Sequence, residues 1–215
     1  MRFLCVIMAV FFVSMSAVAD YRLMIFGDSL SAGYKLPVKD AFYTKLEQAL
    51  HKQGYTNVYV LNESKSGETT AGGLRRLSSA LAKKPDAILL ELGANDMLKG
   101  GSVNTARDNL QKMIDEIEQH NIPVMLIGME LPSVFKPALG RAFANMYTDL
   151  SKKNGLILYP HFMKDVLVVN PRTWMVDKTY ILSDGVHPNK DGVDIMVKNV
   201  LPSVIKFLDE NGVHR

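Results

Sequence analysis

Short apolar runs alternate with longer amphipathic stretches along most of this chain. The runs have the length of β-strands and fall at residues 23–26, 58–61, 87–92, 124–127 and 156–159. Residues 87–92 are apolar at every position except Glu91, which is typical of a central parallel strand covered on both faces. The pattern therefore predicts five strands.

The stretches between these runs carry apolar residues at helical spacing and are preceded by residues that favour helix starts. The expected helices begin after Asp40, after Thr69 or Thr70, after Ser102, near residue 138, near residue 162 as a short element, and at Pro188. Strands and helices thus alternate from end to end, without repeats, low-complexity tracts or linkers. This order predicts an α/β fold in which helices cover both faces of a parallel sheet and the crossovers are right-handed.

The first 19 residues have the pattern of a secretory signal peptide. Arg2 gives a positive start, residues 3–13 are apolar, and Ala17-Val18-Ala19 forms a small-x-small cleavage site. The apolar run is too short for a spanning helix, so an uncleaved membrane anchor is the weaker alternative. We expect cleavage after Ala19, no stable membrane insertion, and a single domain over residues 20–215 that is periplasmic or secreted.

Composition narrows the classes of partner. Removing residues 1–19 removes one of 25 basic residues and none of 22 acidic ones, so the mature net charge is 24 − 22 = +2. Without a long basic run we expect no nucleic-acid partner. The one cysteine is lost with the leader, so no disulfide is expected. The five histidines are scattered without metal-ligand spacing, so we expect no metal. We also expect no cofactor and a monomeric protein.

Ser29 is the candidate nucleophile. The first apolar run stops at Gly27, and a serine just beyond the carboxyl end of a strand lies where α/β sheets bind ligands. Such a serine needs a base and donors for the oxyanion, which the stretches 66–69, 93–96 and 184–188 could supply. Asp28 is expected to fix the turn through its carboxylate. The alternative is an ordinary serine in a strand-to-loop turn.

Asp184 and His187 are the candidate acid–base pair. At a spacing of three residues within a turn, the carboxylate can reach Nδ1 of the imidazole and leave Nε2 to face Ser29. This arrangement fixes the imidazole tautomer and stabilises the imidazolium. In the alternative reading Asp184 only caps a helix and His187 is incidental.

Four short blocks in order resemble those of the SGNH (GDSL) hydrolase superfamily. The blocks are Gly27-Asp28-Ser29-Leu30, Gly67, Gly93-Ala94-Asn95-Asp96 and Asp184-Gly185-Val186-His187-Pro188. The stretch from Ser66 to Leu74 is similar to the periplasmic acyl-CoA thioesterase I / lysophospholipase L1 / arylesterase group. The resemblance covers nearly the whole mature chain and implies a three-layer α/β/α flavodoxin-like fold with a mainly parallel five-stranded sheet.

Within this resemblance, Ser29, Gly67 and Asn95 are the expected oxyanion-hole residues. Ser29 and Gly67 would each donate a backbone N–H, and Asn95 a side-chain amide N–H. The alternatives are a turn glycine at Gly67 and a capping residue at Asn95. Ala94 stands where relatives in this group carry a second glycine, which leaves the aim of Asn95 open.

Apolar residues in or beside the strand-end loops could form a shallow groove for an acyl chain. They are Met97, Leu98, Met129, Leu131, Val134, Phe135, Trp174 and Met175. Flexible methionines would let such a groove accept several chain shapes. Residues 129–137 are expected to border the crevice opposite His187, with Phe135 as its largest apolar group. Ordinary packing under loops is the alternative.

The resemblance implies esterase, thioesterase, lysophospholipase and arylesterase activities. We therefore expect an exported serine esterase of lipid or aryl esters that forms an acyl-enzyme on Ser29. CoA thioesters are poor candidates for the physiological substrate because CoA is cytoplasmic. A carbohydrate O-acetylesterase and a non-catalytic flavodoxin-like binding module are the alternatives, although the chain lacks dinucleotide and P-loop motifs.

Overall fold

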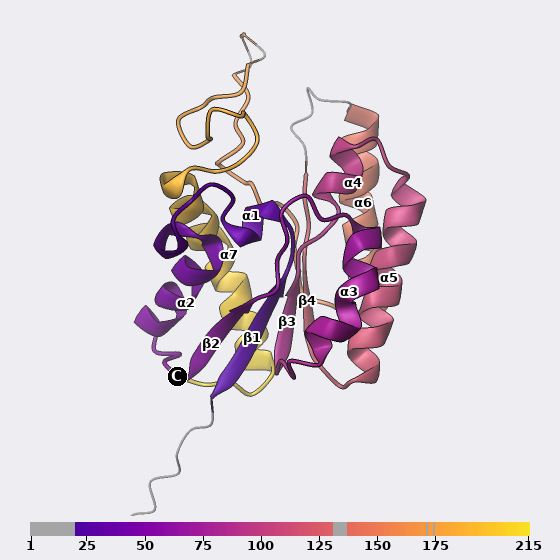
Figure 1. Ribbon diagram of the computed structural model, residues 1–215, viewed down its shortest axis with the longest axis vertical. Coiled ribbons are helices and arrows are strands. Elements are labelled where there is room, and N and C mark those ends of the chain that lie inside the picture. Colours follow the sequence, from indigo (N-terminus) through magenta and orange to yellow (C-terminus); the bar gives the residue numbers. More distant parts are fainter. Residues whose placement is uncertain (1–19, 131–136, 171, 174) are drawn as a thin grey trace, which may run out of the picture.

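The computed structural model describes residues 20–130, 137–170, 172–173 and 175–215. Its centre is one five-stranded sheet in the order β2-β1-β3-β4-β5, and each of the four pairings is parallel (Figure 1). The strands are β1 (Tyr21–Phe26), β2 (Val58–Asn62), β3 (Ala87–Leu90), β4 (Val124–Ile127) and β5 (Leu158–Tyr159). This order and direction confirm the flavodoxin-like α/β fold predicted from the sequence.

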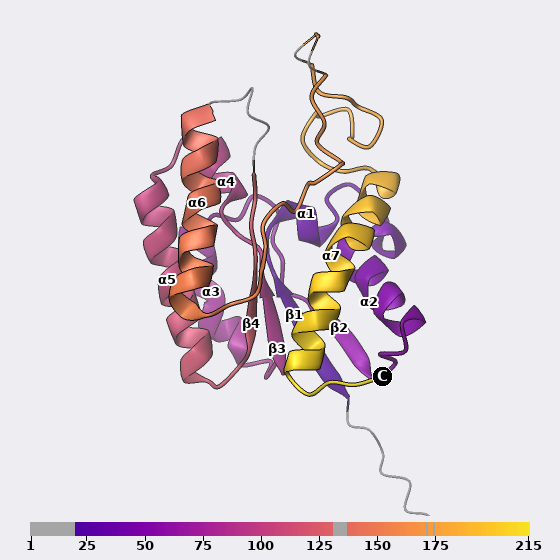
Figure 2. The same ribbon diagram turned by 180° about the vertical axis from the view of Figure 1, so that it is seen from behind.

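Helices form a layer on each face of the sheet (Figures 1 and 2). One layer contains α2 (Phe42–Lys52) and α7 (Lys190–Glu210), and the other contains α3 (Thr70–Leu81), α5 (Val103–Gln119) and α6 (Pro137–Asn154). The chain runs from β1 to one edge of the sheet and then returns past β1 toward the other. Right-handed crossovers in opposite directions put their helices on opposite faces.

The central strands are buried because both of their faces are covered. Residues 23–26 of β1 are fully buried, and every residue of β3 and β4 is buried. Complete burial of one aliphatic side chain contributes about 1.5–3 kcal/mol. The strands that end at the site are thus anchored in the most apolar part of the molecule.

Two helix starts differ from the sequence prediction. Asp40 belongs to a separate 3₁₀ turn, η1 (Val38–Asp40), and α2 begins after Ala41 without a side-chain cap. Helix α7 begins at Lys190 with Asn189 as its N-cap, two residues after the predicted start. Pro188 is held in an antiparallel bridge to Ile181, so it stays extended although proline is favourable at a first helical position. Of the two candidate caps of α3, Thr69 is the one that accepts a hydrogen bond, from the N–H of Gly72.

The connection between β5 and α7 also departs from expectation. Residues 162–167 form turns and a bend in place of a short helix, and Asp165 has a left-handed φ of +63° that interrupts any helix. Strand β5 is two residues long and β3 ends at Leu90, so both strands are shorter than their apolar runs. Figure 1 shows the connection rising beyond the carboxyl ends of the strands.

The strand order creates a crevice between β1 and β3. The chain leaves β1 toward β2, and it leaves β3 toward β4 on the opposite side. Ligands bind α/β sheets at such switch points, outside the carboxyl ends of the strands. The short helices α1 (Ser29–Ala32) and α4 (Ala94–Leu98) follow β1 and β3 at this point. Among the described helices, none is long and apolar enough to cross a membrane.

Candidate active site

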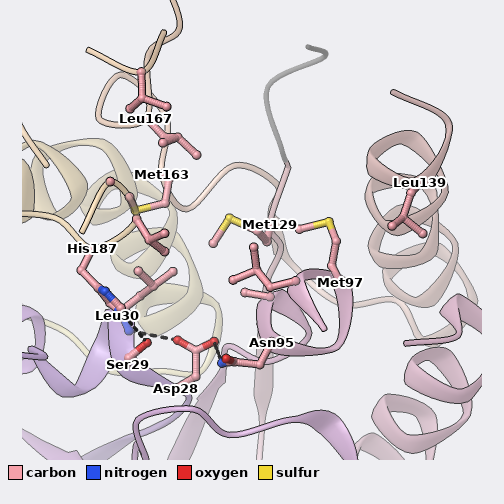
Figure 3. Close-up of a pocket in the computed structure, with 15 residues that line it drawn as sticks. Asp28, Ser29, Leu30, Asn95, Met97, Met129, Leu139, Met163, Leu167 and His187 are labelled. Atoms are coloured by element: carbon pink, nitrogen blue, oxygen red, sulfur yellow. Dashed lines mark hydrogen bonds between the residues drawn. The ribbon is translucent and has the colours of Figure 1, made fainter. Parts of the chain in front are cut away.

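Ser29, His187 and Asp184 lie in one hydrogen-bonded line. Ser29 is the first residue of α1, and its Oγ is 2.9 Å from Nε2 of His187 (Figure 3). On the other side of the ring, Nδ1 is 3.0 Å from Oδ2 of Asp184. The structure thus brings together three residues that the sequence places up to 158 positions apart. A hydroxyl, an imidazole and a carboxylate in this order can pass a proton from serine to histidine.

The loop that carries Asp184 and His187 holds itself in shape. Oδ1 of Asp184 accepts the backbone N–H groups of Val186 and His187, at 3.1 and 3.0 Å. Partial burial acts to raise the pKa of Asp184, but these two bonds and the imidazole outweigh it, so the pKa lies below its usual value. The carboxylate is therefore ionised at neutral pH, as an imidazolium partner requires.

Tyr34 covers the His187 imidazole. The two ring centroids are 4.4 Å apart with the planes tilted by 41°, and Lys35 Nζ lies 5.0 Å from the Tyr34 ring centroid. Tyr34 follows α1, so the segment that carries the nucleophile also restrains the base. Sequence reasoning missed this contact, although an aromatic residue in a loop just after the nucleophile was a usable signal.

Asp28 connects the nucleophile to Asn95. Its Oδ1 accepts the N–H of Leu30 at 2.9 Å and so caps α1, and its Oδ2 accepts the side-chain amide of Asn95 at 3.0 Å (Figure 3). Burial raises the pKa of Asp28 to about 6, and the bonds from Leu30 and Asn95 oppose the rise. The carboxylate thus orders the turn, as expected, and also orients the residue across the crevice.

Glu91 also holds the turn between β1 and α1, and the sequence analysis did not identify it as a site residue. The side chain is 2% exposed, and Oε2 accepts the N–H of Asp28 at 3.1 Å and the hydroxyl of Ser31 at 2.8 Å. Burial, followed by the nearby charge of Asp28, raises the pKa of Glu91 well above its usual value. A Cβ on Gly27 would lie 2.6 Å from Oε2, which explains the glycine. A lone acid in an apolar run was the available signal.

The two further oxyanion candidates are placed differently. Asn95 lies in α4 and lines the cavity beside Ser29. An amide nitrogen carries two hydrogens, so the bond to Asp28 leaves one for a substrate. Gly67 has a φ of +78°, and its carbonyl accepts Lys99 Nζ at 3.0 Å, but it does not line the cavity. Ala94 is buried and also lines it.

A mainly apolar cavity of about 550 Å³ opens beside Ser29 (Figure 3). This volume is typical of small-molecule sites. Ten apolar side chains line it: Leu30, Ala94, Met97, Leu98, Met129, Leu139, Met163, Leu167, Val176 and Val186. The polar lining residues are Asp28, Ser29, Asn95 and His187. The cavity can therefore hold an apolar group while the polar residues face its reacting end.

The predicted acyl groove coincides with this cavity only in part. Met97, Leu98 and Met129 line it, whereas Met175 is 65% exposed and does not. Leu131, Val134, Phe135 and Trp174 lie outside the described residues. Leu139, Met163, Leu167 and Val176 were missed. Most of these belong to the β5–α7 connection. Its position directly after a strand could have identified it as part of the site, but part of it resembled a short helix.

The described ranges contain no group of three or more His, Cys, Asp or Glu side chains that could hold a metal ion.

The sequence matches the GDSL-like Lipase/Acylhydrolase family over residues 25–195. The chain belongs to this family. It is 34% identical to an arylesterase of Vibrio mimicus over 199 residues, which cover 92% of this chain and 95% of the relative. It is also 34% identical to Thioesterase 1/protease 1/lysophospholipase L1 of Escherichia coli (strain K12) over 194 residues, 88% of this chain and 87% of the relative.

Solved structures agree with the family assignment. A crystal structure of TesA superposes with a TM-score of 0.79 at 31% identity, and the match covers 87% of this chain and 99% of that one. The resemblance to SGNH hydrolases is thus confirmed, and this GDSL-family protein is an ester-hydrolysing enzyme. A non-catalytic binding module is accordingly the weaker alternative.

Proposed function

We propose that the chain is an exported serine esterase that hydrolyses carboxylic esters and thioesters of lipids through an acyl-enzyme on Ser29. The observation that carries this proposal is the 2.9 Å contact between Ser29 Oγ and His187 Nε2 at the edge of an apolar cavity. The relatives named arylesterase and thioesterase/lysophospholipase support the same class of substrates.

In the first half-reaction, Ser29 Oγ attacks the carbonyl carbon of the ester and transfers its proton to His187 Nε2. Asp184 stabilises the imidazolium through Nδ1. The carbonyl oxygen becomes an oxyanion that accepts hydrogen bonds from the Ser29 N–H, the Gly67 N–H and the free amide hydrogen of Asn95. The bond to the leaving group then breaks, and His187 gives its proton to the departing alcohol or thiol.

In the second half-reaction, water attacks the acyl-enzyme while His187 accepts its proton. The second tetrahedral intermediate collapses, the carboxylic acid leaves, and the proton returns to Ser29 Oγ. Throughout both halves Asp28 and Glu91 keep the α1 turn and Asn95 in place through their hydrogen bonds.

The apolar lining of the cavity favours an acyl chain over a sugar. Ten of its fifteen lining residues are apolar, and none of the ten offers a hydrogen bond to a hydroxyl-rich ligand. A carbohydrate O-acetylesterase would need polar or stacking groups there. The apolar wall and the three methionines suit chains of differing shape.

Export is supported by the order of elements at the N-terminus. Cleavage after Ala19 would leave Asp20 as the first residue, immediately before β1, and would keep the strand whole. The mature chain, residues 20–215, would then be one SGNH hydrolase domain. The intact mass of the exported protein should correspond to a start at Asp20, and a full-length membrane-bound product would contradict export.

A fluorophosphonate probe tests the nucleophile. We expect Ser29 to be labelled in the wild-type enzyme, and Ser29→Ala to lose both labelling and hydrolysis, whereas Ser66→Ala keeps both. A label on Ser31, Ser64 or Ser66 would assign the reaction to another serine. A panel of aryl esters, lysophospholipids, acyl-CoA and acetylated sugars tests the substrate class, and a preference for the acetylated sugars would favour the carbohydrate alternative.

A further inference from the structure

The exposed large apolar side chains of the described chain gather at one end of the molecule. Seven such side chains are exposed, and six of them lie in segments that follow β1, β3 or β5 at the carboxyl ends of the strands. We call these six the apolar rim: Tyr34, Val38, Leu98, Val168, Met175 and Val186. The seventh, Tyr59, lies in the edge strand β2. Exposed apolar side chains that gather on one face mark interaction sites, whereas singly scattered ones do not.

The apolar rim is continuous with the lining of the cavity. Leu98 and Val186 belong to both. In the β5–α7 connection, an antiparallel bridge joins Val169 to Val176, and the N–H of Asp177 donates to the carbonyl of Val168 at 2.8 Å. Side chains alternate along such extended segments.

The alternation divides this hairpin between cavity and solvent. Leu167 and Val176 line the cavity, while their neighbours Val168 and Met175 are 44% and 65% exposed. Figure 1 shows the segment projecting beyond the sheet at the same end as α4. An apolar path thus leads from the outer surface to Ser29.

Basic residues that form no ion pair accompany the apolar rim. Lys35, Lys39 and Lys99 each directly follow a rim residue, Arg172 lies between the bridged residues Val169 and Val176, and Lys178 follows the hairpin. All five are exposed, and within the described chain none forms an ion pair. Acids at this end have partners of their own. Asp40 pairs with Lys45, Asp165 accepts from Asn199, Asp177 from Thr179 and Asp184 from His187, and Glu130 contacts His161.

We propose that the apolar rim and these cations dock the enzyme on an anionic phospholipid surface. Apolar side chains enter the headgroup region while lysine and arginine interact with anionic headgroups, which is how peripheral proteins bind bilayers without spanning them. The proposal rests on the lipid-ester function above and deepens it. A docked enzyme would let an acyl chain pass from the lipid into the cavity along the apolar path, without crossing water.

Sedimentation with vesicles of ether-linked phospholipids tests docking apart from hydrolysis, because these lipids contain no carboxylic ester for the enzyme to cleave. We expect the wild-type enzyme to bind vesicles of ether-linked phosphatidylglycerol and phosphatidylcholine, to bind more weakly as salt increases, and to bind pure phosphatidylcholine vesicles at least tenfold more weakly. Equal binding to both compositions, or binding to neither, would overturn the proposal.

Matched variants locate the surface. Each basic residue near an anionic surface contributes roughly a fivefold factor to partitioning, so Lys39→Glu with Lys178→Glu should weaken binding at least tenfold. Val38→Asp with Met175→Asp should do the same, since these are the two most exposed rim residues. The controls Tyr59→Asp and Lys52→Glu with Lys112→Glu make similar changes elsewhere and should bind like wild type. Equal losses in the controls would show that the rim is not the docking face.

A soluble short-chain aryl ester separates this proposal from the function it rests on. The four substituted positions are Val38 and Met175 in the apolar rim and the cations Lys39 and Lys178. None of them lines the cavity, so these variants should hydrolyse that ester within about twofold of wild type. They should lose activity on lysophospholipid presented in anionic vesicles. If the wild-type enzyme cleaves the soluble ester but binds no vesicles, docking fails and the esterase proposal stands. If it cleaves no ester of any kind yet binds vesicles, the esterase proposal fails instead.

Discussion

Oε2 of Glu91 lies 3.1 Å from the backbone nitrogen of Asp28 and accepts its hydrogen. The same oxygen accepts the Ser31 hydroxyl at 2.8 Å, so one buried acid is bonded to residues on both sides of Ser29. Because the turn leaves β1 with no side chain at Gly27, this acid fills the space beneath it. The position of Ser29 thus depends on Glu91, which directly follows the neighbouring strand β3.

Two substitutions of Glu91 should show whether its hydrogen bonds or its negative charge matter for the site. Burial raises the pKa of Glu91 well above its usual value and so favours the neutral form, and the neutral side chain of glutamine offers the same acceptor oxygen. Glu91→Gln should keep kcat within about threefold of wild type. Glu91→Ala leaves two buried donors unpaired at about 1–3 kcal/mol each, which corresponds to a fall of several degrees in Tm. Calorimetry and steady-state kinetics on both variants would check this, and equal losses in the two would contradict it.

Glu91 should also make the wild-type protein less stable as the pH rises. A raised folded-state pKa means that the neutral form is favoured, so the stabilisation from Glu91 is complete below pH 4.5 and is lost as pH rises through the folded value. Glutamine does not titrate. The Tm of Glu91→Gln minus that of wild type should therefore increase from pH 5 to pH 9. Thermal melts across this range measure it, and a constant difference would show that Glu91 does not ionise.

The order of the elements could be predicted from the sequence because buried strands appear in it as apolar runs. The prediction was wrong where contacts between distant residues decide the local structure. Pro188 is a good first helical residue, yet its bridge to Ile181 keeps it extended. Six of residues 162–169 are apolar. Met163 and Leu167 line the cavity and Phe162 and Val166 are buried in the core, and their spacing does not distinguish these roles from a helix.

The same division holds for the site. The contact between Asp184 and His187 is local, so the spacing predicts it. The contact of Glu91 with Asp28 joins residues 63 positions apart, and it exists only because β1 and β3 are neighbours. No pattern within either segment contains that information.

Asn95→Ala should reduce kcat by roughly 10²–10³ with little change in KM, which is the usual effect of losing one oxyanion donor. The variant also removes the bond to Asp28 Oδ2, so stability must be measured beside kinetics. Asn104→Ala, at an exposed position in α5, is the matched control and should behave like wild type. An effect confined to KM would identify Asn95 as a substrate contact.

The far end of the cavity should set the preferred acyl length. Leu139, near the start of α6, lines the cavity well away from Ser29 (Figure 3). Each methylene buried contributes about 0.8 kcal/mol, or roughly fourfold in kcat/KM. Leu139→Trp shortens the space and should lower kcat/KM for long-chain esters by one to two orders of magnitude, while acetyl esters stay within about threefold.

Leu139→Met conserves volume and should retain the wild-type chain-length profile, which controls for disturbance of α6. Kinetics on a series of aryl esters from acetyl to palmitoyl would measure both variants. If the tryptophan variant loses acetyl and long-chain activity equally, it disturbs the fold and says nothing about length. If it loses neither, the acyl chain runs past Met163 and Leu167 instead, toward the β5–α7 connection that lines the other side of the cavity.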